Sequence, residues 1–183
     1  MALVFLSSQT ASTSSSIDFT SGIDGTYNEY LFTIVNFKPV TDAKQICFQV
    51  DTGTNTSYNQ TITSTTFNAG TSDTGGWTSL AYLTGADQAE GTALQRLSYT
   101  GESNTIPSLT NSGELRLYAP SSSTYTKHFT GSVNCIYDSS GTRYNIVLHT
   151  AGYVNTTTAL TRVRFAAITG NIYTGTFTLY GVS

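Results

Sequence analysis

Histidines and carboxylates are the side chains that most often transfer protons in enzymes, and this 183-residue chain has two histidines and eleven carboxylates. Neither His128 nor His149 lies in a HExxH or GxSxG motif. Both fall within runs typical of β-strands, "KHFTG" and "VLHTAG". Acid–base chemistry needs titratable groups gathered in one place. A single strand histidine is more often a packed or interface residue than a base, so neither histidine indicates an active site.

The acidic residues are dispersed singly along the chain. Glycoside hydrolysis requires two carboxyl groups that converge, and no such pair can be read from the sequence. The triplet "DTG" at 51–53 matches the aspartic-protease motif only in three common residues. Neither a calcium-loop spacing nor a glycine-rich phosphate loop before a helix is found. We therefore predict a protein that is not an enzyme and that uses no metal or cofactor.

Three aromatic residues of the loop-rich stretch 51–85 are candidates for a glycan or receptor contact: Tyr58, Trp77 and Tyr82. Exposed rings of this kind can stack on sugars, and several Asn and Asp residues that could bind hydroxyl groups lie nearby in the sequence. The alternative for Trp77, the single tryptophan, is a buried position or a subunit contact.

Charged residues make up only 10% of the chain, and the net charge is −3. The eight Lys and Arg are scattered, which argues against nucleic acid as a partner. No apolar stretch approaches the roughly 20 residues of a membrane helix, and "MALVFLSS" is too short and lacks the basic start of a signal peptide. The aromatic content of 12% together with the low charge is typical of protein interfaces. We expect no membrane insertion.

The two cysteines, Cys47 and Cys135, lie far apart in strand-like runs. Two cysteines in a chain of this length form no disulfide framework. We expect two reduced, partly buried thiols, with a single bridge between them as the alternative.

Alternating and apolar runs predict about eight to ten strands and no helix longer than a turn near 85–97. This pattern favours an antiparallel β-sandwich of the jelly-roll type. The short connection between 29–37 and 44–50 predicts that these two strands form a hairpin. In 60–70, Ile62 and Phe67 fall on opposite faces, which suggests a bulge. The predicted strands cover 29–37, 44–50, 60–70, 93–99, 114–120, 125–138, 143–155, 160–168 and 175–182.

Residues 1–16 are expected to form an extended N-terminal arm ahead of a sandwich domain at 17–183. The stretch "SSQTASTSSS" is too polar to order itself alone. An apolar segment before it could anchor the arm by adding a strand to an exposed sheet edge. That edge could belong to the same domain, a second subunit or a host assembly. The anchoring residues are Leu3, Val4, Phe5 and Leu6.

Three segments carry a resemblance to a known family: "SIDFTSGIDGTYNEYLFTIVNFKPVTD" at 16–42, "STYTKHFTGSVN" at 123–134 and "AGYVNTTTALTRVRFAAITGNIYTGTFTLYGVS" at 151–183. They resemble β-structured virion proteins and fibre-tip domains of tailed bacteriophages, especially those of marine or cyanobacterial hosts. The resemblance implies a structural module without catalytic residues or cofactor. The middle of the chain, 51–110, resembles the family least, so we expect a partner or receptor surface there.

The resemblance implies a non-enzymatic structural protein of the phage virion, assembled in the host cytoplasm. We expect a small surface-bound module such as a capsid decoration (cement) protein. Its partners would be further copies of itself, in a homotrimer, and other virion proteins. The alternative is a tip protein of a tail fibre or spike that binds a receptor or a host surface glycan.

Overall fold

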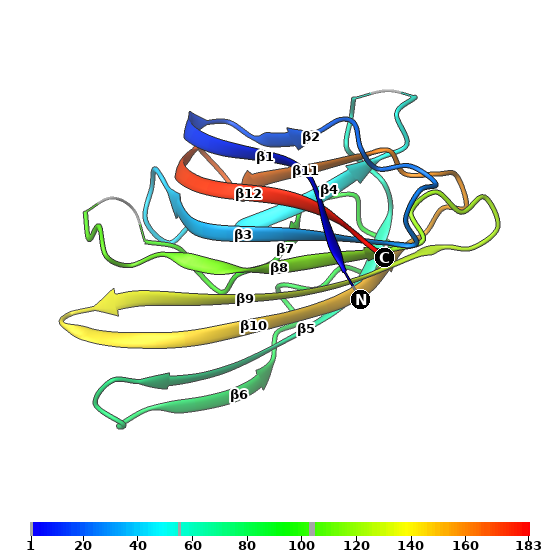
Figure 1. Ribbon diagram of the computed structural model, residues 1–183. Helices are drawn as coiled ribbons and strands as arrows, with labels where there is room; N and C mark the ends of the chain where they lie inside the picture. The colour runs from blue at the N-terminus through cyan, green and yellow to red at the C-terminus, as the bar shows by residue number, and fades with distance from the viewer. Residues whose placement is uncertain (1, 55, 103–104) are drawn as a thin grey trace.

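The computed structural model describes residues 2–54, 56–102 and 105–183, and these ranges contain twelve β-strands and no helix (Figure 1). The strands form two antiparallel sheets, which confirms the all-β sandwich. In spatial order, the eight-stranded large sheet comprises β1 (Leu3–Ser14), β12 (Ile172–Val182), β3 (Glu29–Pro39), β8 (Asn111–Tyr118), β9 (Lys127–Ser139), β10 (Thr142–Val154), β5 (Ile62–Ser72) and β6 (Thr78–Tyr82). The four-stranded small sheet comprises β2 (Ile17–Phe19), β11 (Arg162–Ala167), β4 (Ile46–Asp51) and β7 (Gln95–Arg96).

Eight of the strands have jelly-roll order. The remaining four, β5, β6, β9 and β10, can be set aside. When the eight strands are renumbered 1 to 8 in chain order, one sheet has the order 1-8-3-6 (β1-β12-β3-β8) and the other has the order 2-7-4-5 (β2-β11-β4-β7). The other four strands are two hairpins inserted into this framework. The β9–β10 hairpin pairs with β8, and β5–β6 extends the same sheet beyond β10. The insertions therefore double the width of one sheet only.

The predicted hairpin between 29–37 and 44–50 is wrong, because β3 and β4 lie in different sheets. The connection between them crosses from one layer of the sandwich to the other, as jelly-roll topology requires. The predicted bulge in 60–70 is also wrong. The register of β5 with β10 is continuous from Ile62 to Ser72, so Ile62 points into the core while Phe67 lies on the opposite face and is 44% exposed.

The core lies between the small sheet and the central strands of the large sheet. Alternate residues of each strand point inward, as the period of two in a β-strand dictates. Aromatic rings meet edge to face across the layers: Phe32 with Phe165 at 5.5 Å between centroids, and Phe48 with Phe129 at 5.0 Å. Such contacts add to the free energy gained from burial itself.

Residues 3–14 form β1, which lies along β12 at the edge of the domain's own sheet (Figure 1). Three sheet edges were considered for this segment, and the structure shows the first of them, an edge of the same domain. Hydroxyl groups link the polar half of β1 to its neighbour: Ser8 lies 3.0 Å from Thr178. The strand ends at residue 14, and Ile17 in β2 is already part of the core. Residues 15 and 16 connect β1 in the large sheet to β2 in the small sheet.

The four proposed anchoring residues, Leu3 to Leu6, occupy the start of β1. Phe5 is 62% exposed and meets Tyr180 of β12 edge to face, 6.2 Å between centroids. Among the described residues, no helix is long and apolar enough to cross a membrane.

Candidate functional site

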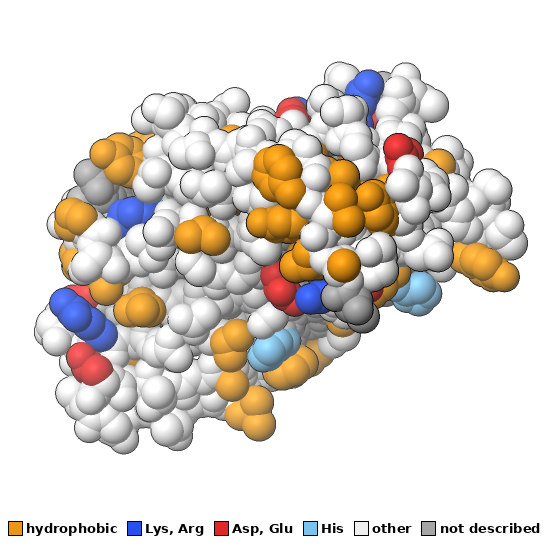
Figure 2. Space-filling model, in the orientation of Figure 1, with side chains coloured by type: hydrophobic (Ala, Val, Ile, Leu, Met, Phe, Trp, Pro, Cys, Tyr) orange, Lys and Arg blue, Asp and Glu red, His pale blue; other side chains and the backbone are white. Residues whose placement is uncertain are grey.

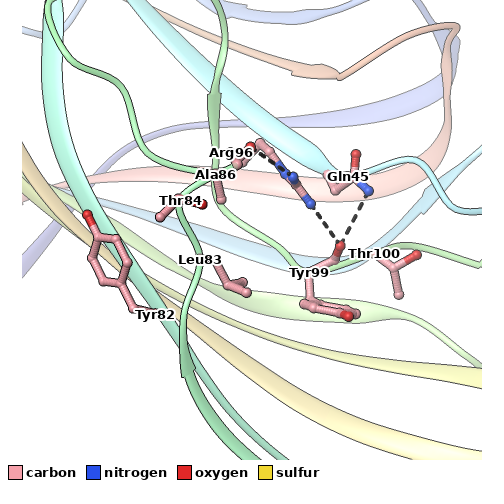
Figure 3. Close-up of a pocket in the computed structure, with 9 residues that line it drawn as sticks. Gln45, Tyr82, Leu83, Thr84, Ala86, Arg96, Tyr99 and Thr100 are labelled. Carbon is pink, nitrogen blue, oxygen red and sulfur yellow. Dashed lines mark hydrogen bonds between the residues drawn. The ribbon is translucent and has the colours of Figure 1, made fainter.

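An open pocket of about 460 Å³ lies where the segment after β6 meets β7 (Figure 3). A volume of this size suits a small ligand. Arg96 is the one charged residue in its lining, and amide and hydroxyl groups supply most of the other polar atoms. The pocket is lined by Gln45, Tyr82, Leu83, Thr84, Gly85, Ala86, Arg96, Tyr99 and Thr100.

Backbone pairing fixes the position of Arg96. Strand β7 is only two residues long, and Arg96 pairs there with Cys47 of β4. From this position the guanidinium donates to two carbonyl oxygens, that of Gly85 at 3.3 Å and that of Tyr99 at 3.2 Å. The side chain of Gln45 donates to the same Tyr99 oxygen at 3.3 Å. Figure 3 shows both side chains converging on this carbonyl.

Arg96 has no counter-charge within the described part of the chain: no carboxylate oxygen comes within 4.0 Å of its nitrogens. Its Nε atom is buried and has no hydrogen-bond partner among the described residues. Two other arginines are neutralised. Arg116 pairs with Glu29 and Glu114, and Arg164 pairs with Asp18. Arg96 therefore differs from both in presenting an uncompensated positive charge to a pocket.

The three predicted contact residues do not form one site. Tyr82 lines the pocket, but its ring points away from Arg96 (Figure 3), and its hydroxyl donates to Asp87. This hydrogen bond raises the pKa of Tyr82. Trp77 lies at the opposite end of β6, half-buried, and packs edge to face on Tyr144 at 5.4 Å. Neither alternative for Trp77, a fully buried ring or a contact with another chain, is shown.

Tyr58 lies beside the small sheet, 7% exposed. Its backbone N–H donates to Asp51, and Arg164 lies over its ring. Burial raises the pKa of its hydroxyl. The ring also borders a second pocket of about 440 Å³, together with Ser57 and Arg164. The cation that covers one face of this ring is itself paired with Asp18.

Both histidines lie on the outer face of the large sheet, which is the face seen in Figure 2. His149 stacks on Phe67 at 5.1 Å, and His128 lies 6.4 Å from Tyr153. A small hollow of about 250 Å³ opens beside the first pair, over Thr65, Thr130 and Ala151. Within residues 2–54, 56–102 and 105–183, no three His, Cys, Asp or Glu side chains are grouped to hold a metal ion.

The outer face of the inserted hairpins is a feature that the sequence analysis did not identify. Register places Tyr82, Phe67, His149 and Ser132 in one row across β6, β5, β10 and β9. The next row contains Leu80, Ala69, Val147 and Asn134. Neither row has an acidic or basic residue other than histidine. Leu80 is 79% exposed and Tyr82 56%, and Figure 2 shows hydrophobic side chains gathered near a histidine on this face.

Comparisons with known proteins gave no match to a family model, to a curated protein or to a solved structure.

Proposed function

We propose that this chain is a non-enzymatic structural protein of a tailed-bacteriophage virion, a surface-bound module such as a capsid decoration protein. It works as a homotrimer that contacts other virion proteins. The resemblance of segments 16–42, 123–134 and 151–183 supports the phage origin. The jelly roll supports the structural role by analogy, since viral capsid domains commonly use it.

The observation that carries the proposal is the pair of uncharged rows on the outer face of the inserted hairpins, one through Phe67 and one through Leu80. Charged side chains are depleted and aromatic side chains enriched in the cores of protein interfaces. The two rows through Phe67 and Leu80 have this composition, although both side chains are substantially exposed in the single chain. A second copy or a neighbouring virion protein that covered them would remove this apolar surface from water.

Light scattering coupled to gel filtration tests the self-association. We expect a mass of three chains of 19.6 kDa for the unaltered protein. Leu80→Asp should shift the mass toward one chain, because it places a charge in the apolar row. Tyr125→Asp is the matched control: Tyr125 is 71% exposed, but it lies in the loop between β8 and β9. A monomer at high concentration that also fails to bind assembled particles would overturn the proposal.

A second candidate function, a receptor- or glycan-binding tip of a tail fibre or spike, is favoured by the pocket at Arg96. Its polar lining suits a small hydroxylated ligand better than an apolar one. Purified protein should then block phage adsorption to host cells, and Thr84→Trp, which places a large ring at the exposed pocket wall, should abolish the block. If the altered protein blocks adsorption as well as the original, this pocket is not the receptor site.

A further inference from the structure

The uncompensated charge of Arg96 indicates what kind of ligand the pocket accepts. A guanidinium carries five N–H donors in a planar fork. In this structure two of them reach carbonyl oxygens, at 3.2 and 3.3 Å, which is the long end of the usual range. The guanidinium of Arg96 is partly buried and, among the described residues, bonds only to neutral carbonyl groups, whereas carboxylates neutralise the charges of Arg116 and Arg164. An anionic ligand would neutralise Arg96 in the same way.

We propose that the pocket binds the carboxylate of an acidic saccharide, a hexuronic acid residue, with Arg96 as its anchor. The inference rests on the second candidate function above and names its ligand class. Arg binds carboxylates through two parallel hydrogen bonds, a geometry that adds specificity to charge. The pocket lining contains no acidic residue that would repel such a ligand.

The remainder of the lining favours a saccharide over a bare inorganic anion. Thr84 and Thr100 contribute hydroxyl groups, and Gln45 contributes an amide whose oxygen can accept from a sugar hydroxyl. A small inorganic ion held by Arg96 alone would not need these hydroxyl and amide groups. A volume of about 460 Å³ also exceeds what a single phosphate or sulfate fills and leaves space for a sugar ring.

Calorimetric titration with tri-galacturonate and with its fully methyl-esterified form tests the inference, because esterification removes the charge of each carboxylate and adds only a methyl group to it. We expect the acid to bind and the ester to bind at least tenfold more weakly. Arg96→Gln should weaken binding of the acid by a similar factor. Arg143→Gln, which removes the same charge from an exposed residue of β10, should leave it unchanged.

A melting curve of each variant shows whether it is folded. Thr84→Trp provides a second test at an exposed wall residue, should Arg96→Gln unfold the domain. Equal binding of acid and ester would overturn the claim that the pocket recognises the carboxylate, and it would leave the glycan-binding function standing. If inorganic phosphate competes as strongly as the saccharide binds, the claim that the ligand is a saccharide is overturned. If neither saccharide binds, the inference is wrong, and the adsorption assay decides the candidate function independently.

Discussion

Arg164 lies over the ring of Tyr58, with its guanidinium carbon 3.9 Å from the ring centroid. The same guanidinium makes a two-pronged contact with Asp18, through Nε at 2.8 Å and Nη2 at 2.7 Å. Asp18 is in β2 and Arg164 in β11, so the contact ties the edge strand of the small sheet to its neighbour. Ring, cation and carboxylate form one unit.

Removing the cation should destabilise this edge of the sheet. We expect Arg164→Met to lower the free energy of unfolding by about 1–2 kcal/mol, since a two-pronged pair and a cation–π contact are lost together at a partly exposed site. Urea denaturation measures the loss, and Arg143→Met on the exposed end of β10 is the control. A change below about 0.3 kcal/mol would show that the unit contributes nothing, as many surface ion pairs do.

Lys127 is fully buried and has no carboxylate partner among the described residues. Its ammonium group donates to the carbonyl oxygens of Ser122, Tyr125 and Thr156, at 2.6, 3.0 and 3.2 Å. It therefore joins the loop before β9 to the loop after β10. Burial lowers the pKa of this ammonium group.

We expect Lys127→Met to cost about 2 kcal/mol or more, because it removes three hydrogen bonds from a buried ammonium group to carbonyl oxygens of two loops. The loop before β9 should also loosen, so chymotrypsin should cleave after Tyr125 faster than in the unaltered protein. Lys44→Met, at a half-buried lysine that no carbonyl cage surrounds among the described contacts, serves as the control. Unchanged stability together with unchanged cleavage would show that the carbonyl cage is not important.

How far the sequence predicts this fold depends on the range of the interactions. The alternation of Phe177 and Leu179 with Thr176 and Thr178 is a local property of the sequence, and in the structure the two apolar side chains are buried while the two threonines are half-buried. The pairing of β3 is not local. The short connection to β4 favours a hairpin between the two strands. In the structure β3 lies in the large sheet and β4 in the small sheet, so this connection crosses from one sheet to the other.

The pocket at Arg96 could not be predicted for the same reason. Gln45, residues 83–86 and Tyr99 are separated in sequence and meet only because β7 pairs with β4. Nothing in the local pattern distinguishes Arg96 from the arginines that have carboxylate partners. Phe67 illustrates the opposite error. A large ring out of phase with Ile62 suggested a bulge, whereas it marks an exposed face on a regular strand.

The pH dependence of the free energy of unfolding should reveal the raised pKa of Glu102. Burial raises the pKa of this carboxyl above 4.5, Asp42 and Asp138 raise it further, and the Asp138 N–H and Lys38 act in the opposite direction. Between the unfolded and the folded pKa the folded state therefore binds more protons than the unfolded state. The free energy of unfolding contributed by this group falls as the pH rises through that window.

Replacing Glu102 by Gln removes this loss. Urea denaturation should show Glu102→Gln to be more stable than the unaltered protein at pH 7. The difference should shrink as the pH falls through about 4 and disappear near about pH 3, where the carboxyl is protonated in both states. Glu90→Gln, at an exposed position, is the control for the loss of one charge. A difference that is the same at about pH 3 and at pH 7 would contradict titration of Glu102 as the cause.

The two thiols should be inert in the folded protein. Cys47 and Cys135 are free and both fully buried, rather than partly buried as the sequence suggested. Burial raises the pKa of Cys47 to about 12 and also raises that of Cys135.

Because the thiolate is the reactive form, we expect no reaction of the native protein with a disulfide reagent at pH 8. In denaturant, two equivalents of the reagent should react per chain. Cys135→Ser should halve the denatured value and leave the native value at zero. Rapid native labelling of either thiol would mean that the strands around it open far more readily than their burial implies.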